Sequence, residues 1–121
     1  MDIVFEEGRV AVASNDIATA KKSLAEYTRQ VAEQKRPFEV RQQHELAGLV
    51  ALAERDYSTA TRELQLANQQ DPRVLYALSL AWKGAGDAGQ ATKFATKAAN
   101  FNGLNFNYAY VRSKARKTTG T

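Results

Sequence analysis

The sequence contains no cysteine, which excludes disulfide bridges, thiol nucleophiles and thiolate metal sites. No apolar run approaches the ~20 residues that a membrane-spanning helix requires. The first residues include Asp2, Glu6 and Glu7, where a signal peptide would carry positive charge, so we expect no signal peptide and no membrane span. A cytoplasmic location is slightly favoured, although a periplasmic domain trimmed of its signal would look the same.

Catalytic and metal-binding patterns are also scarce. The single histidine, His44, lies on an apolar helical face without further ligand residues, so we interpret it as a packing residue. The glycine-rich stretch from Lys83 to Asp87 lacks the preceding strand of a phosphate-binding loop and is interpreted as a turn. The adjacent Glu6 and Glu7 point about 100° apart on a helix and cannot share a substrate atom. We therefore expect no enzyme activity, cofactor or metal.

What the sequence does contain is helical periodicity, and the clearest case spans residues 41–72. This stretch is typical of two helices joined by a tight turn, in which Asp56 can cap the second helix and Pro72 ends it. Each helix has an apolar face with the i, i+3, i+4 or i, i+3, i+7 spacing of one helical side. The two faces are His44, Ala47, Gly48 and Ala51, followed by Tyr57, Ala60, Leu64 and Ala67.

Similar residues recur on both sides of this stretch. Four upstream residues lie 40 positions before similar residues of the 41–72 stretch, and three downstream residues lie 31 positions after similar residues of that stretch. A fixed period of this kind indicates a repeat architecture. The upstream copies are Gly8, Asp16, Ala20 and Leu24, and the downstream copies are Asp87, Ala91 and Ala98.

These residues resemble the bacterial-type tetratricopeptide repeat, a helix-turn-helix unit of about 34 residues. The resemblance depends on Gly48, Asp56, Tyr57, Ala60 and Ala67 and on the end at Asp71-Pro72. It implies an all-α solenoid, a right-handed superhelix of three helix pairs that is closed by a C-terminal capping helix. Glu7 and Tyr27 depart from the family pattern, which has an apolar and a small residue at these places.

The expected organisation is a single domain over residues 1–121, since 121 residues with an apolar fraction of 44% suit one core. Repeat 1 covers about residues 1–36, repeat 2 about 38–71, repeat 3 about 72–102 and the capping helix about 105–117. The expected helices span residues 2–14, 16–35, 38–54, 57–69, 72–84, 88–100 and 105–117.

Family geometry implies the function, a non-catalytic scaffold or adaptor that binds a peptide, a helix or a partner surface in a concave groove. The first helix of each pair would form the groove wall. An amphipathic helix or an extended apolar segment would suit its mixed lining. The implied lining residues are Phe5, Arg9, Val12, Gln42, Glu45, Leu49, Leu52, Tyr76, Leu80 and Lys83.

Two further surfaces remain open alternatives. Arg112, Lys114, Arg116 and Lys117 form a basic run, whereas residues 1–104 contain 13 basic and 13 acidic side chains. Contact of this run with nucleic acid or an anionic surface is the alternative function, and nucleic acid is the less favoured partner. The N-terminal edge is rich in apolar residues, which predicts either self-association through the first helix pair or further repeats upstream in a longer parent protein. The apolar residues of this edge are Ile3, Val4, Phe5, Val10 and Val12.

The expected capping helix gives a first test. Removing residues 105–121 should expose the apolar face of the third repeat around Ala91, Ala95 and Ala98, since terminal repeats need a water-tolerant outer face. We expect a lower Tm and some aggregation, measured by thermal unfolding and light scattering. An unchanged Tm together with a monomeric truncated chain would contradict the capping role.

Overall fold

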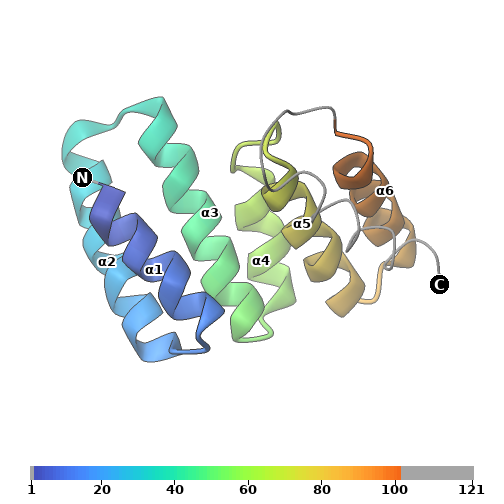
Figure 1. Ribbon diagram of the computed structural model, residues 1–121, viewed down its shortest axis with the longest axis horizontal. Helices are drawn as coiled ribbons and strands as arrows, with labels where there is room; N and C mark the ends of the chain where they lie inside the picture. Colours follow the sequence, from blue (N-terminus) through green and yellow to red (C-terminus); the bar gives the residue numbers. More distant parts are fainter. Residues whose placement is uncertain (1, 102–121) are drawn as a thin grey trace. The chain divides into compact units, whose positions relative to one another are not determined.

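The computed structural model describes residues 2–101, and these residues form six α-helices and no strand (Figure 1). The all-helical class predicted from the sequence is therefore confirmed for this range. The predicted helix at 105–117 lies outside the described residues. In chain order the helices are α1 (Asp2–Ala13), α2 (Ile17–Gln34), α3 (Pro37–Ala53), α4 (Tyr57–Gln65), α5 (Pro72–Gly84) and α6 (Ala88–Ala99).

The helices belong to two compact units, with the division between Asn68 and Gln69. The first unit contains α1 to α4, in which α1 pairs with α2, α3 pairs with α4, and α3 also packs against both α1 and α2. The second unit contains the α5–α6 pair.

The same chain reversal joins the helices of all three pairs. At its centre is a residue in the left-handed region: Asn15 with φ of 60°, Arg55 with φ of 63° and Gly86 with φ of 89°. The next backbone N–H, from Asp16, Asp56 or Asp87, donates to a carbonyl five residues earlier at 2.7, 2.8 and 3.0 Å respectively. This bond defines a Schellman motif, which satisfies carbonyl groups left unpaired at a helix C-terminus.

The aspartate that ends each reversal also begins the following helix. The Oδ1 atoms of Asp16, Asp56 and Asp87 accept the backbone N–H of the residue three positions later, at 3.2, 3.3 and 3.0 Å. A carboxylate in this position satisfies an otherwise unpaired N–H group and favours the positive end of the helix dipole. One residue thus connects the end of one helix to the start of the next.

Two glycines allow close contacts between helices in the first unit. A Cβ atom on Gly48 of α3 would lie 2.5 Å from Cγ of Leu64 on α4, and one on Gly8 of α1 would lie 2.8 Å from Cδ2 of Leu46 on α3. Leu46 and Leu64 are both completely buried. A larger residue in place of either glycine would therefore clash with the buried leucine beside it.

An aromatic pair is central to the core of the first unit. The rings of Phe5 on α1 and Tyr27 on α2 have centroids 5.5 Å apart, and both side chains are buried. The Tyr27 hydroxyl donates to Oε1 of Gln42 at 2.8 Å, which connects α2 to α3. Tyr27 thus fills space beside Phe5 in the core, and its polar end retains a partner. The core also includes Ala11, Ala20, Val31, Leu46 and Val50.

In the second unit, α5 and α6 both contribute buried side chains. On α5, Leu75, Leu78 and Ser79 are buried, and the Ser79 hydroxyl donates to the carbonyl of Tyr76 at 2.6 Å. Asp71 caps α5 by accepting the backbone N–H of Arg73 at 2.9 Å. On α6, the buried residues are Ala91, Phe94, Ala95, Ala98 and Ala99.

The fourth helix is shorter than the sequence predicted. It ends at Gln65 instead of residue 69, because Leu66 and Ala67 donate to carbonyls only three residues earlier, at 3.0 and 3.2 Å. Such bonds tighten the backbone and end an α-helix. The second helix has 18 residues and the fourth has 9, which accounts for much of the difference between the 40-residue and 31-residue spacings.

The contact at Gly48 predicts a large effect of a small substitution. Gly48→Ala should reduce the free energy of unfolding by about 1–3 kcal/mol, because the new methyl group overpacks against Leu64. Gly89→Ala is the matched control, since its Cβ would meet only Oδ1 of Asp87 at 3.6 Å. Helix propensity should make the control neutral or stabilising. Urea denaturation measures both variants, and equal effects would contradict the close approach.

The cap at Asp56 predicts a specific dependence of stability on pH. Hydrogen bonds from the side chain and then the backbone of Thr59 lower the pKa of Asp56 from its ordinary value of 3.8. The stability that this carboxylate contributes is therefore fully present above pH 3.8 and is lost as the pH falls through its lower folded-state pKa. The unfolding free energies of the wild type and Asp56→Asn should converge below pH 3.8. A difference that stays constant with pH would contradict this role.

Candidate functional site

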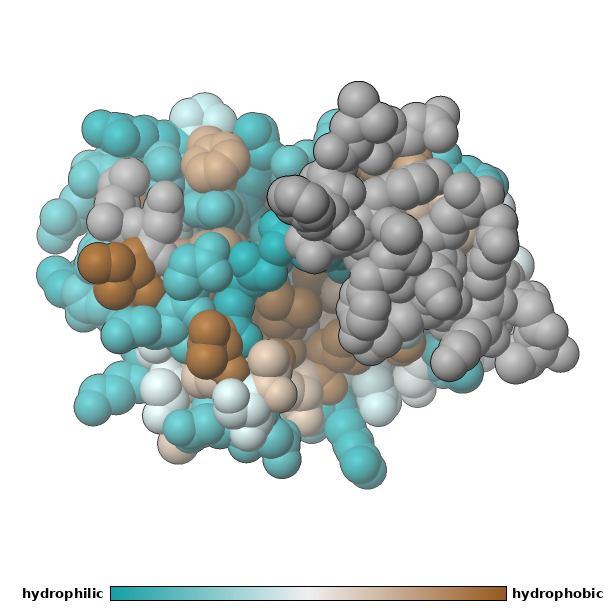
Figure 2. All heavy atoms as spheres, viewed as in Figure 1, coloured by the Kyte–Doolittle hydropathy of each residue, from teal (hydrophilic) through white to brown (hydrophobic). Residues whose placement is uncertain are grey.

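Most of the candidate groove residues of the first unit lie at least partly exposed on α1 and α3. Val12, Gln42, Leu49 and Leu52 are half-buried, and Gln42 is engaged by the Tyr27 hydroxyl. Arg9 is also half-buried; its Nη1 pairs with Oε2 of Glu6 at 3.3 Å and its guanidinium lies 5.8 Å from the centre of the Phe5 ring. Apolar side chains lie among hydrophilic ones where α1 and α3 face the viewer (Figure 2).

Two candidate residues of this unit are interior residues instead. Phe5 is 2% exposed because its ring packs against Tyr27, and Glu45 is 7% exposed. Neither side chain offers a surface that a ligand could cover. The resemblance to the repeat family implied that Phe5 lies on the wall, but its ring packs inward against Tyr27, a large partner on α2.

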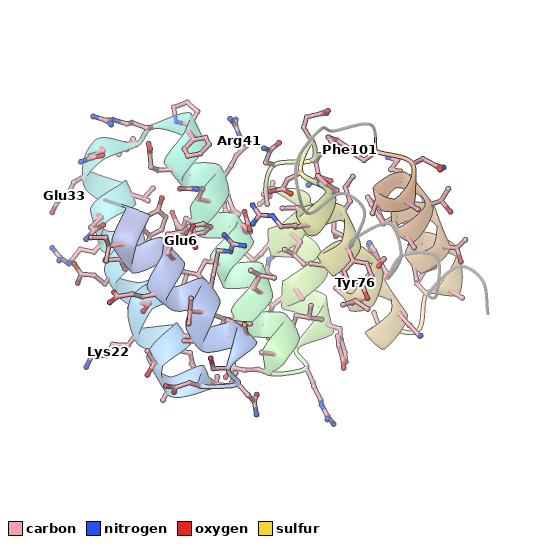
Figure 3. The ribbon with its side chains drawn as sticks, in the orientation of Figure 1. Glu6, Lys22, Glu33, Arg41, Tyr76 and Phe101 are labelled. Atoms are coloured by element: carbon pink, nitrogen blue, oxygen red, sulfur yellow. The ribbon has the colours of Figure 1, made fainter. Side chains whose placement is uncertain are left out.

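In the second unit, the candidate residues are all on α5. Tyr76, labelled in Figure 3, and Leu80 are half-buried, and Lys83 is exposed near the helix C-terminus. Tyr76 and Leu80 are four residues apart and therefore share one side of the helix. An aromatic and an aliphatic side chain thus lie together, with a cation one turn further along.

A groove lies between α1 and α2, on a surface that is not part of the expected concave wall. It encloses about 890 Å³, and α3 contributes no residue to its lining. Apolar and small side chains from both helices line its length, and charged side chains lie beside them. The lining residues are Val4, Glu7, Val10, Ala11, Ser14, Asp16, Thr19, Lys22, Ser23, Ala25, Glu26 and Arg29.

This groove lies next to strongly exposed apolar side chains. Ile3 and Val10 on α1 are 69% and 62% exposed, whereas Val4 and Val12 are partly buried against the core. Exposed apolar residues at the N-terminal edge were expected from the sequence. Apolar surface of this kind, bordered by charged groups, is typical of an interaction site.

A polar contact between α3 and α4 could not be predicted from helical spacing. Nδ1 of His44 lies 2.8 Å from Oε1 of Glu63, and both side chains are mostly buried. Glu63 is 19 positions away, so only the pairing of the two helices brings it beside His44. His44 is therefore a polar contact residue at the edge of the α3–α4 interface as well as a packing residue.

Other chemistry in the described range is limited. Residues 2–101 contain no group of three or more histidine or carboxylate side chains that could hold a metal ion. None of the helices in that range is long and apolar enough to cross a membrane. A small cavity of about 270 Å³ is lined partly by Glu39, whose Oε1 atom is buried without a hydrogen-bond partner. Because this oxygen is closed off from solvent, a ligand in the cavity could not reach it.

Comparison with known proteins assigns no relative to this chain. No family model matches it, and neither a curated protein nor a solved structure matches it.

Proposed function

We propose that this chain is a non-catalytic protein-interaction module of the tetratricopeptide-repeat type, in which three helix pairs stack as a right-handed solenoid. The observation that carries the proposal is the same capped reversal in all three pairs, with a left-handed residue followed by an aspartate cap. A helix pair cannot bury its apolar face alone, so repeated pairs are expected to stack into a continuous core.

The proposed binding surface is the wall formed by the first helix of each pair. Leu49 and Leu52 on α3 and Tyr76 and Leu80 on α5 are half-buried, so part of each side chain is accessible to a partner. Large apolar and aromatic side chains supply most of the energy at protein interfaces. Phe5 and Glu45 would support this wall from the interior, since both are buried.

The partner that best suits such a wall is an amphipathic helix or an extended segment with apolar side chains. The exposed cation Lys83 and the half-buried Arg9 would contact acidic or polar groups at the border of the apolar area. The asparagines and lysines with which chaperone-type tetratricopeptide domains hold a peptide's C-terminal carboxylate are not reproduced in this sequence, so a free C-terminus is a poor candidate ligand.

The test combines capture of partners with wall variants. The full chain is used as bait in native lysate, and captured proteins are identified by mass spectrometry. We expect Leu49→Glu and Tyr76→Ala each to weaken binding of a captured partner by about 2 kcal/mol, because interface anchors of this kind carry such energies. Leu66→Glu is a matched control, since Leu66 is 53% exposed but lies just beyond α4, outside the wall.

Binding of nucleic acid or an anionic surface, the alternative function, predicts the opposite ranking of the variants. Contacts between the basic run and phosphate groups would weaken steeply with salt, and Arg116→Ala would then reduce binding more than the wall variants. This result, together with silent Leu49→Glu and Tyr76→Ala variants, would overturn the proposed protein-binding wall.

A further inference from the structure

We propose that this chain forms a two-fold symmetric dimer in which the groove between α1 and α2 packs against the same groove of a second copy. This inference goes beyond the proposed function, because the groove and the α3–α5 candidate residues are different surfaces. It rests on the apolar lining of the groove and on the positions of two charged residues.

The apolar part of the groove supplies the driving force. Val10, which is 62% exposed, lines the groove together with Val4, Ala11 and Ala25. Ile3, which is 69% exposed, lies one helical turn before the lining residue Glu7 on the same side of α1. Burying apolar surface of this kind is favourable in proportion to the area removed from water. The small side chains allow another helix to come close.

The charges in the groove are paired within the chain, with two exceptions. Arg29 pairs with Glu26 and Glu33, and the Asp16 carboxylate accepts the Thr19 N–H. By contrast, Glu7 on α1 and Lys22 on α2 line the groove without an ion pair to any described residue. The groove therefore presents one acid and one base that are available to a partner.

The register of the two helices fixes the relative level of these two charges. A Cβ atom on Gly8 would lie 3.3 Å from Cβ of Ser23, so these residues are level in the antiparallel α1–α2 pair. Glu7 and Lys22 each immediately precede one of these two residues. They therefore differ in level by two residues, or about 3 Å along the helix axes, on opposite sides of the groove.

This arrangement selects one of two symmetric packings. A two-fold axis parallel to the helices places α1 over α2 of the second copy, so that Glu7 approaches Lys22 of the second copy, and the reverse contact forms as well. All neighbouring helices are then antiparallel, as in an up-down four-helix bundle. A two-fold axis across the helices near the level of Glu7 would place α1 over α1 and bring the two Glu7 side chains toward each other, which like-charge repulsion disfavours.

Charge reversal tests the contact directly. Sedimentation equilibrium of the full chain over a range of concentrations should show a monomer–dimer equilibrium. Glu7→Lys alone and Lys22→Glu alone should each weaken dimerisation about tenfold, because each turns two attractive contacts into two repulsive ones. In an equimolar mixture, the Glu7→Lys chain has bases at positions 7 and 22, and the Lys22→Glu chain has acids at both. The mixed dimer should therefore form with close to wild-type strength.

The recovery in the mixture separates this contact from damage to the fold, since two misfolded variants would not rescue each other. Arg41→Glu is the control, because Arg41 is an exposed cation on α3 outside the groove (Figure 3). The Arg41→Glu variant should dimerise as strongly as the wild type. A chain that stays monomeric at all concentrations, or a dimer that ignores both reversals, would overturn the proposal. Failure of the mixed Glu7→Lys and Lys22→Glu variants to form dimers would also overturn the proposal.

Discussion

The reversal between paired helices is the constraint on which the rest of the structure depends. Each pair can bury its apolar faces only if the chain turns back within a few residues at a fixed angle. The Schellman bond and the aspartate cap provide this turn, because they satisfy the polar groups of both helix ends at once. At Arg55 the left-handed conformation costs about 1–2 kcal/mol, whereas asparagine, as at Asn15, tolerates this conformation better.

Once the reversal is fixed, side-chain size decides how closely the helices pack. Gly48 admits Leu64, and Gly8 admits Leu46, so each buried leucine has a partner position without a side chain. In α1 and α3 these glycines are 40 positions apart, as are the aspartates at the two reversals. The turns are therefore equivalent at the two places, whereas the contacts differ, since Gly48 meets the other helix of its own pair and Gly8 meets Leu46 of the next pair.

Periodicity and turn chemistry were sufficient to predict the six described helices, because both are local properties of the sequence. What they could not predict depends on contacts between distant residues. Phe5 lies inside because Tyr27 on another helix packs against it, and His44 has its acidic partner 19 positions away. The groove between α1 and α2 was anticipated only as an apolar N-terminal edge, since its shape depends on how the two helices pair. The early end of α4 is a local exception: it depends on hydrogen bonds to carbonyls three residues back, which apolar spacing does not reveal.

The α1 helix takes part in two separable surfaces because its sides are chemically different. Arg9 and Val12 belong to the wall that we propose for partner binding, whereas Val4, Glu7 and Val10 face the groove toward α2. Residues three and four apart share a helical side, so the set at 4, 7 and 11 is distinct from the set at 5, 9 and 12. A dimer formed through the groove would therefore leave the wall residues of α3 uncovered by the contact. Assembly and partner binding could then operate in the same molecule, and changes in one surface would leave the other intact.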